Sequence, residues 1–292
     1  MRGKSETGVF VMSDFHRFDV GRFRCAAVND GGYDYDPAGF FNGVPENEYR
    51  AELVRTGITT EKLRTPYTSV VVETGSEVIL VDTGAGSLAP TTGLLPTSLA
   101  NAGFPAESIS IVAITHAHPD HIGGVLDAER KPRYPNARYV IPRLDWEFWF
   151  SDEAERTVRK HPVPFVEMAR GALKPVESRT TLLEFGDEIA PGVSFVEAAG
   201  HTPGHAMVAF RSGAEKFMFG SDAIVLALHI EHPDWNPDVY HLDPKRADAT
   251  KRRVADLIAD ENWLAIFQHF YPFPSLGRIE KNGDAWRWVP EG

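Results

Sequence analysis

Three histidines and one aspartate lie within residues 115–121 of this chain. Imidazole nitrogens and carboxylate oxygens are common ligands of divalent metal ions, and no ordinary structural role requires them at this density. In extended backbone the side chains alternate with a period of two, so His116 and His118 share one face. The proline that follows turns the chain and re-aims Asp120 and His121. The segment therefore predicts two pairs of metal ligands directed at two adjacent points.

The residues around this segment predict the elements that must position it. Residues 109–115 are apolar and β-branched, which is typical of a short buried strand that runs into the histidines. Gly123 and Gly124 follow the ligands and allow backbone to pass close to whatever is bound there. Upstream, residues 69–73 and 78–82 are strand-like and are separated by a short turn, which predicts a hairpin.

The rest of the chain alternates between strand and helix patterns, which indicates sheets covered by helices in a layered α/β sandwich. We expect a first strand over residues 18–30 that ends at Gly31 and Gly32. Residues 33–66 are rich in Tyr, Pro, Gly and Asn with little periodicity, and they predict a long ordered arm or loop on the surface. The other expected elements are strands at 137–141, 181–184, 193–198, 207–211, 216–220 and 263–267, and helices at 97–102, 144–159 and 244–258.

The composition excludes several classes of protein. Of the 292 residues, 42% are hydrophobic and 24% are charged, which is ordinary for a globular chain with a sizeable core. The formal charge of −11 disfavours nucleic acid and anionic lipid as partners. Cys25 is the single cysteine, so an intramolecular disulfide is impossible. No window approaches the roughly 18 apolar residues of a membrane-spanning helix, and residues 1–17 lack a signal-peptide pattern. We therefore expect a flexible N-terminal segment over 1–17 and a cytoplasmic location.

The ligand-rich segment resembles the signature of the metallo-β-lactamase superfamily. Three later segments match that family in its order, at residues 200–205 (GHTPGH), 220–222 (GSD) and 267–269 (FQH), and residues 81–84 (VDTG) match a family turn. A single such motif could arise by chance, but four coordinated segments make coincidence improbable. The resemblance implies a single domain over residues 18–292. Its fold would be a four-layer αβ/βα sandwich, in which two packed mixed sheets are flanked by helices.

The resemblance also implies a binuclear metal centre. Because the ligands include no cysteine, two Zn²⁺ ions suit them best, and Mn²⁺, Co²⁺ or Fe²⁺ are also admissible. The charge of two divalent ions exceeds that of two carboxylates and one hydroxide, and the surplus would attract a substrate oxygen. Asp120 and Asp222 are the expected catalytic residues. The seven expected ligands are His116, His118 and His201 on one ion, Asp120, His121 and His269 on the other, and Asp222 bridging both.

Further residues are expected around the ligands. Asp82 and His205 would orient the ligands or pack against them. His16, His161, His229, His232 and His241 are interpreted as surface or hydrogen-bonded histidines, although His229 and His232 follow Asp222 closely enough to line the cleft. The two tryptophans of the expected helix at 144–159 belong either to the pocket or only to the core. The expected substrate-binding residues are Trp146, Trp149, Val225, His229, Phe270, Tyr271 and Phe273.

This constellation predicts hydrolysis. Two ions about 3.5–4 Å apart acidify a shared water and stabilise developing charge. We expect a binuclear metal-dependent hydrolase whose metal-bridging hydroxide attacks a small ester, lactone or phosphotriester. The aromatic segments resemble those of methyl parathion hydrolases and quorum-quenching lactonases, so an N-acyl homoserine lactone lactonase is the first alternative. Many of those lactonases carry a tyrosine three residues after the bridging aspartate, where this chain has Val225.

Other classes remain open at this point. A mononuclear iron persulfide dioxygenase would use only His116, His201 and Asp222. A metal-retaining binding or regulatory module would keep the ligands without turnover. A di-iron redox protein is disfavoured because that class usually has glutamate where His118 stands. The expected partner is a small-molecule substrate, and a homodimer that exchanges the arm 33–66 between subunits is an additional hypothesis.

Overall fold

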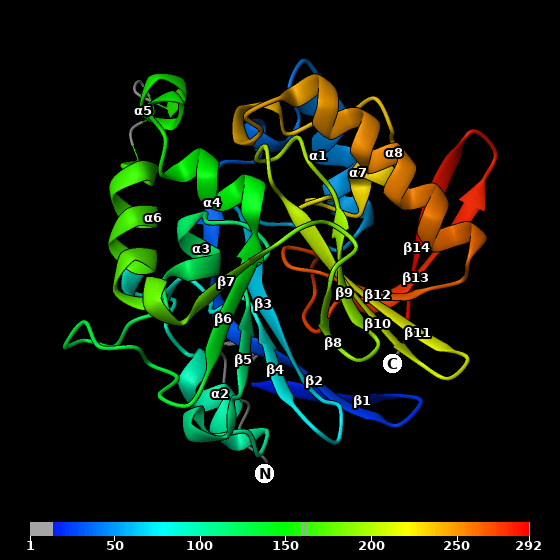
Figure 1. The fold of residues 1–292 in the computed structure, drawn as a ribbon. Coiled ribbons are helices and arrows are strands. Elements are labelled where there is room, and N and C mark those ends of the chain that lie inside the picture. Colours follow the sequence, from blue (N-terminus) through cyan, green and yellow to red (C-terminus); the bar gives the residue numbers. More distant parts are fainter. Residues whose placement is uncertain (1–13, 159–160, 162, 292) are drawn as a thin grey trace, which may run out of the picture.

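The computed structural model describes residues 14–158, 161 and 163–291. Residues 1–13 of the expected N-terminal segment therefore lie outside the described residues, whereas the first strand already begins at Phe15. The described chain forms two sheets of seven strands each, and helices cover the outer face of both (Figure 1). This arrangement confirms the expected sandwich of two mixed sheets flanked by helices.

The first sheet is built from the N-terminal half of the chain. Its strands follow one another in sequence order, antiparallel from β1 to β4 and parallel from β4 to β7. The strands are β1 (Phe15–Val20), β2 (Phe23–Tyr35), β3 (Leu63–Glu73), β4 (Val78–Val81), β5 (Ile111–Ala113), β6 (Arg138–Pro142) and β7 (Thr180–Leu183).

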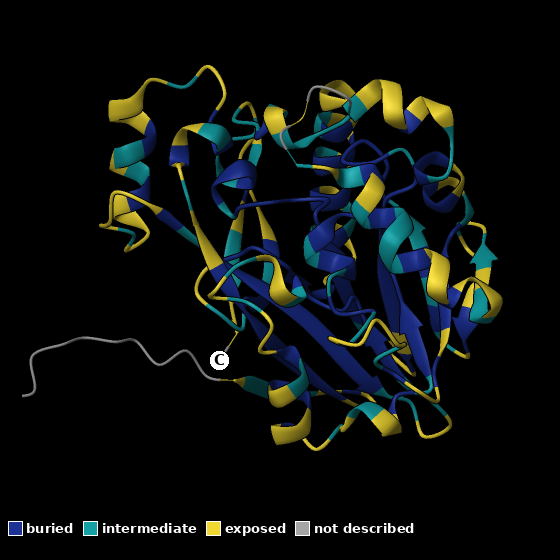
Figure 2. Ribbon diagram, turned by 90° about the vertical axis from the view of Figure 1, so that its left-hand side faces the viewer, coloured by how far each residue is buried: buried dark blue, intermediate teal, exposed yellow. Residues whose placement is uncertain are grey.

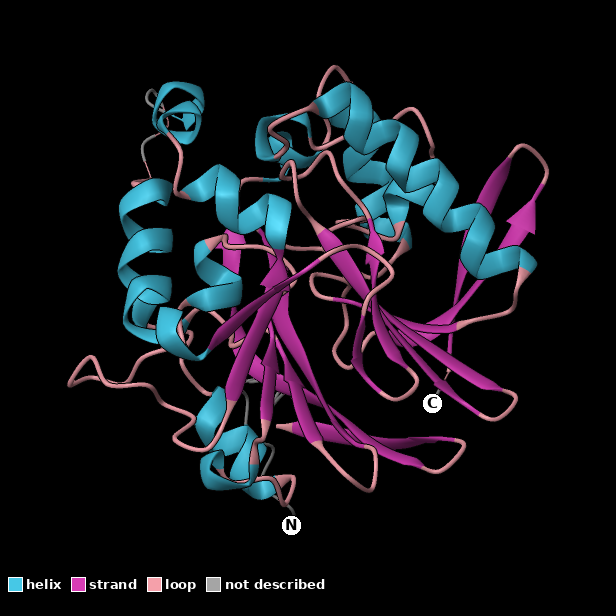
Figure 3. Ribbon diagram, viewed as in Figure 1, coloured by secondary structure: helices cyan, strands magenta, loops and turns pink. Residues whose placement is uncertain are grey.

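The second sheet comes from the C-terminal half and lies against the first (Figure 3). Its order runs from β14 to β8, and only the pair β11 and β12 is parallel. The strands are β8 (Glu188–Ala190), β9 (Val193–Glu197), β10 (Ala206–Ser212), β11 (Glu215–Ser221), β12 (Leu264–Phe267), β13 (Leu276–Asn282) and β14 (Ala285–Pro290).

Helices occupy the two outer layers, and in Figure 2 their outward faces are exposed while the strands between them are buried. No helix among the described residues is both long and apolar enough to cross a membrane. The α-helices are α1 (Glu46–Arg55), α2 (Leu95–Asn101), α3 (Pro119–Ile122), α4 (Arg143–Trp149), α5 (Asp152–Val158), α6 (Phe165–Leu173), α7 (Leu228–Glu231) and α8 (Pro244–Asp260).

Alternation along the strands explains the layers. Val70 and Val72 of β3 face the second sheet and pack in one cluster with Phe195 and Phe219. Val71 points the other way, into the cluster beneath α2, α4 and α6. Because successive side chains point to opposite faces of a sheet, a continuous apolar strand can serve two cores at once. The β3–β4 hairpin itself is antiparallel, as the sequence predicts.

Three expectations about local structure are wrong. The single strand over 18–30 is the hairpin β1–β2, which turns at Gly21 with a φ of +57°. Gly31 and Gly32 do not end β2, because a bulge between Asn29 and Gly32 lets pairing with β3 resume. The single helix over 144–159 is broken into α4 and α5. The sequence patterns also missed β8, β13, β14 and α6.

The stretch 33–66 is ordered, as the sequence suggests, but it is not a surface arm or loop, because it forms regular elements that pack on the domain. It contains the end of β2, a 3-10 turn at Pro37–Phe40, helix α1 and the start of β3. Its apolar side chains form a cluster of their own with the segment that follows Asp222, represented by Phe41 and Leu53 against Val225 and Leu228. The stretch therefore packs on its own chain. Subunit exchange through it stays an untested hypothesis.

Candidate metal centre

The ligand-rich segment begins where β5 ends and is held by the neighbouring turn. Thr115 donates its backbone N–H and its hydroxyl to the two carboxylate oxygens of Asp82, both at 2.8 Å. A Cβ on Gly124 would lie 2.2 Å from the carbonyl oxygen of Thr83. The glycine pair thus allows α3 to approach the turn after β4, whereas the sequence suggested that it admits a bound ligand. Close backbone packing requires glycine at this position.

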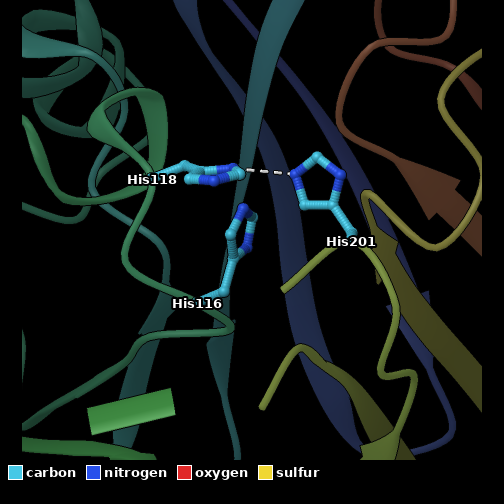
Figure 4. A group of neighbouring side chains, drawn as sticks. All are labelled: His116, His118 and His201. Carbon is cyan, nitrogen blue, oxygen red and sulfur yellow. Dashed lines mark hydrogen bonds between the residues drawn. The ribbon is translucent and has the colours of Figure 1, made fainter. Parts of the chain in front are cut away.

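One group of candidate ligands consists of His116, His118 and His201, whose ring nitrogens lie within 4.8 Å of one another. Figure 4 shows the three imidazoles pointing toward one another from two separate segments. Nδ1 of His118 lies 2.8 Å from Nε2 of His201. Two neutral imidazoles in this contact either share one proton or direct both lone pairs at one cation. The second possibility is that of a metal site.

A second group consists of Asp120, His121 and His269 and has the same compactness. Oδ2 of Asp120 lies 3.4 Å from Nε2 of His269 and 3.9 Å from Nε2 of His121. Nδ1 of His269 lies 3.2 Å from the carbonyl oxygen of Pro66, so that nitrogen can donate and leave Nε2 as the acceptor. The fold thereby brings residues about 150 positions apart in sequence into one cluster of lone pairs.

Asp222 lies between the two groups. Its Oδ2 is 3.2 Å from Nε2 of His201 and 3.4 Å from Nε2 of His269, and its Oδ1 is 3.4 Å from Nε2 of His121. The neighbouring Ser221 adopts a φ of +48° at the end of β11. Such backbone conformations are costly for residues other than glycine and persist where the surroundings impose them. The carboxylate of Asp222 can therefore reach ions bound at either group.

The hydrogen bonding of the buried polar atoms in the cluster shows whether they fit metal ions. Buried polar atoms are normally hydrogen-bonded, and each one without a partner costs free energy. Here three buried atoms of the cluster lack any hydrogen-bond partner among the described residues. They are Nε2 of His116 and of His121 and Oδ1 of Asp222. Divalent cations would satisfy such lone pairs, so five imidazoles and two carboxylates fit a divalent metal centre.

The electrostatics of the cluster agree with neutral imidazole ligands in the first group. Burial holds the pKa values of His116 and His118 well below their usual range, and neighbouring histidines lower them further. Burial also lowers the pKa of His121, but the carboxylates of Asp222 and Asp82 outweigh it and raise the pKa overall. Burial raises the pKa of Asp222, whereas His269 and His121 lower it well below its usual range. Around His121 and Asp222, the negative charges of carboxylates and the positive charges of imidazoles therefore compensate one another.

Asp82 and His205 lie behind the ligands. Asp82 accepts a hydrogen bond from Nδ1 of His121 at 2.8 Å, which leaves Nε2 of that ring free. Nδ1 of His205 lies 2.9 Å from the carbonyl oxygen of Ala198, while its Nε2 accepts the backbone N–H of Asp222 at 3.3 Å. Burial lowers the pKa of His205 to about 3, so the ring is neutral and can act as that acceptor. Asp82 therefore contacts the candidate ligand His121, and His205 contacts the candidate ligand Asp222.

The sequence patterns missed two supporting residues. Nδ1 of His241 lies 3.0 Å from Nδ1 of His201, so this histidine is hydrogen-bonded, but the sequence did not indicate that its partner is a candidate ligand. Asp145 accepts hydrogen bonds from the backbone N–H of Ala117 at 2.9 Å and from the hydroxyl of Thr202. This carboxylate therefore joins the two ligand loops, and burial raises its pKa to about 6. No local spacing signals either role, because each contact joins segments distant in sequence.

A cavity of about 660 Å³ opens onto the ligands. Among the expected substrate-binding residues, only Val225 lines it, so the other expectations are corrected. Trp146 and Trp149 belong to the core beneath the helices, and Phe270 stacks in the core on Phe267. Three further residues lie elsewhere: His229 is buried against the carbonyl oxygen of Phe40, Tyr271 is exposed, and Phe273 packs against the cluster between the sheets.

The cavity wall comes instead from segments without a clear sequence signal. Tyrosines of β2 and β3 line it, together with Phe165 at the start of α6. The β2 and β3 strands alternate, so residues two apart face the same way. The aromatic residues that line the cavity besides the histidines are Tyr33, Tyr35, Phe40, Tyr67, Phe165 and Tyr240.

Comparison with known proteins defines the class. The model of the metallo-beta-lactamase superfamily matches residues 64–269, and the chain belongs to that family. No curated protein matches the chain. The chain is thus a metal-dependent hydrolase of this superfamily, as the sequence predicts, and its His and Asp clusters fit a divalent metal centre.

Three solved structures are similar to this chain over most of its length. AidC, a dizinc quorum-quenching lactonase solved with the product N-hexanoyl-L-homoserine, is 28% identical, with a TM-score of 0.89 over 96% of this chain and 98% of that one. The hydrolase AbOPH of the beta-lactamase superfamily is 24% identical, with a TM-score of 0.89 over 96% and 98%. A probable metal-dependent hydrolase from Staphylococcus aureus is 19% identical, with a TM-score of 0.75 over 94% and 99%. The similarity to the last two structures, which are less identical in sequence, shows only that they share the fold of this chain.

Proposed function

We propose that this protein is a dinuclear metal hydrolase that opens lactones carrying an apolar substituent, with N-acyl homoserine lactones as the first substrate class and small esters or phosphotriesters as the wider range. The observation that carries the proposal is the apolar cavity that ends on the ligand cluster. The similarity to a dizinc lactonase that binds N-hexanoyl-L-homoserine supports it. A neutral, partly apolar substrate also suits a chain whose formal charge is −11.

The seven proposed ligands would divide as the geometry groups them, three imidazoles on one side, Asp120 with His121 and His269 on the other, and Asp222 between. When bound, Zn²⁺ or another divalent ion would polarise the scissile carbonyl and increase the acidity of water at the site. Asp120 and Asp222 are the carboxylates closest to that chemistry, and they would serve as ligands and hold polar groups of the substrate or water in place.

The cavity would hold the rest of the substrate. Phe40, Phe165 and Val225 supply apolar surface to its lining. Burial of apolar surface stabilises a bound ligand by about 25 cal/mol per Å², so an acyl substituent would contribute substantially to binding. Hydrolysis of a lactone needs only water as the second reactant, and the chain provides both the polar end and the apolar wall for it.

A mononuclear iron enzyme is the main alternative. It would need His116, His201 and Asp222 only, and would leave the second group of ligands without a role. The buried Nε2 of His121, which has no hydrogen-bond partner, favours two ions. A binding or regulatory module that never turns over substrate is the other alternative, and only an assay separates it from an enzyme.

Elemental analysis and an activity panel test the proposal. We expect about two divalent ions per chain after loading with Zn²⁺, and hydrolysis of N-acyl homoserine lactones together with aryl esters, phosphotriesters and a β-lactam as comparison substrates. The variants Asp222→Asn and His121→Ala should lose turnover while the unfolding transition stays cooperative. One ion per chain with glutathione persulfide oxidation would favour the iron enzyme, and full metal loading without any turnover would favour the binding module.

A further inference from the structure

Two phenols meet at the wall of the cavity. The hydroxyl oxygens of Tyr35 and Tyr67 are 2.5 Å apart. The bulge between Asn29 and Gly32 shifts the register so that Tyr33 pairs with Thr65 and the strands continue past the main sheet. Because side chains alternate along a strand, this extension places the two phenols on the face that lines the cavity.

One of the two phenol O–H groups is not used by the hydrogen bond between Tyr35 and Tyr67. Each phenol carries a single O–H, and their mutual hydrogen bond uses only one of the two. Among the described residues neither hydroxyl has another hydrogen-bond partner. A buried donor without an acceptor costs free energy, and such a donor at a binding site gains a partner when a ligand brings an oxygen. The second O–H is therefore available to a molecule in the cavity.

The position of Tyr67 makes it the phenol that faces the reacting end. Its ring packs edge-on against the imidazole of His269, with ring centres 5.4 Å apart. The rings of Tyr33, Phe40 and Tyr240 surround Tyr35 instead. If Tyr35 donates to the oxygen of Tyr67, the hydrogen of Tyr67 is the one left for the ligand. A phenol keeps its proton at neutral pH, so both hydroxyls can act as donors.

We propose that Tyr67, oriented by Tyr35, donates a hydrogen bond to the substrate oxygen that becomes negative as the lactone opens. The inference rests on the proposed function. In the reaction, the oxygen of water bonds to the acyl carbon, the bond from that carbon to the ring oxygen breaks, and the ring oxygen receives a proton that came from water. Tyr67 keeps its own proton throughout and only stabilises the developing charge. The residue would supply the donor that Val225 cannot offer.

The test compares phenylalanine variants on two leaving groups. Tyr67→Phe should lower kcat on an N-acyl homoserine lactone by roughly 100-fold, the usual cost of one such donor. An ester with a nitrophenolate leaving group needs little stabilisation, so the loss there should stay below about threefold. Tyr35→Phe removes the orienting partner and should cause a smaller loss of the same selectivity. Tyr139→Phe is the matched control, because it removes a buried phenol of the core that does not line the cavity.

The outcomes separate the two proposals. If the wild-type protein hydrolyses neither substrate, the proposed function fails and this inference falls with it. If the wild type opens the lactone and both variants equal it, only the inference is overturned. Equal losses on both substrates, or losses matched by Tyr139→Phe, would show a structural role and would also overturn it. Metal content and the unfolding midpoint of each variant provide readouts independent of turnover, and we expect both to match the wild type.

Discussion

Oδ2 of Asp82 lies 2.8 Å from Nδ1 of His121, and both side chains are fully buried. Asp82 also accepts both donors of Thr115, and its backbone takes a φ of +58°. One carboxylate thus fixes the orientation of a candidate ligand and anchors the loop that carries it. Outer partners of this kind set the tautomer and the basicity of metal-binding imidazoles.

We therefore expect Asp82→Asn to weaken metal binding in the group of Asp120, His121 and His269. An amide places an N–H where one carboxylate oxygen now accepts, so it can no longer satisfy all three donors. Loss of such a partner typically costs roughly 10- to 100-fold in metal affinity. Competition with a chelator of known affinity would measure it. Asp234→Asn, whose side chain is 95% exposed, is the control, and equal affinities in both variants would contradict the prediction.

A second prediction concerns the contact between His201 and His241. If Nε2 of His201 faces a metal, its Nδ1 carries the proton and donates to Nδ1 of His241. His241→Phe removes that acceptor and should lower the affinity of one metal equivalent by roughly tenfold or more. His232→Phe is a suitable control, because His232 stacks on Trp235 away from the ligands. Stepwise metal titration by calorimetry distinguishes one weakened equivalent from two, and two equivalents of wild-type affinity would refute the role.

The sequence predicts the metal chemistry more accurately than it predicts the residues that line the cavity. The candidate ligands His116, His118, Asp120 and His121 lie in one motif, so the geometry of one loop brings them together. The pair of Tyr35 and Tyr67 arises only because a bulge in β2 restores pairing with β3, and nothing in the composition of the stretch signals that register. Pairing between distant strands is set by tertiary packing, which local patterns do not record.

For two tryptophans, the sequence pattern instead suggested a place in the pocket that the structure does not show. Trp146 and Trp149 lie at helical spacing next to a metal motif, and that pattern fits a pocket wall as well as a core. In the structure Trp149 is fully buried, with its ring 5.6 Å from that of His118. It supports the ligand from behind the site. Which face of an apolar helix meets the cavity depends on the layer against which it packs, and the sequence alone does not contain that information.

A third prediction concerns the pH dependence of stability. Asp30 is buried and accepts the backbone N–H groups of Ala85 and Leu95, yet burial dominates and raises its pKa to about 6 from 3.8. The folded protein then binds a proton at higher pH than the unfolded chain. The contribution of Asp30 to the unfolding free energy is largest below about pH 4 and is lost as the pH rises through about 6.

The variant Asp30→Asn isolates this effect. Relative to the variant, the wild-type protein should gain up to about 3 kcal/mol of unfolding free energy between pH 7 and pH 4, since each pKa unit corresponds to about 1.4 kcal/mol. Urea unfolding of both proteins at several pH values, with a chelator present throughout, removes any contribution from metal binding. Parallel pH profiles for the two proteins would show that the carboxyl group of Asp30 titrates normally.

The last prediction tests how closely the two ligand loops must approach. A Cβ on Gly204 would lie 2.0 Å from the backbone nitrogen of Asp145, whereas a Cβ on Gly171 in α6 would meet only the tip of Arg130 at 3.7 Å. Neither glycine has a positive φ, so the two alanine variants differ in space and not in backbone strain. Gly204→Ala should destabilise the fold by about 1–3 kcal/mol, the usual cost of overpacking.

Gly171→Ala should instead stabilise the protein by roughly 0.5–1 kcal/mol, because alanine favours the helix. Gly204→Ala should also lower metal affinity, since the clash separates the loop of His201 and His205 from Asp145, which holds the loop of His116 and His118 through Ala117. Chemical unfolding and metal titration of the two variants measure both effects. If Gly204→Ala binds metal as the wild type does while losing stability, the two ligand loops are held at their distance by the strands alone and Asp145 is dispensable to the site.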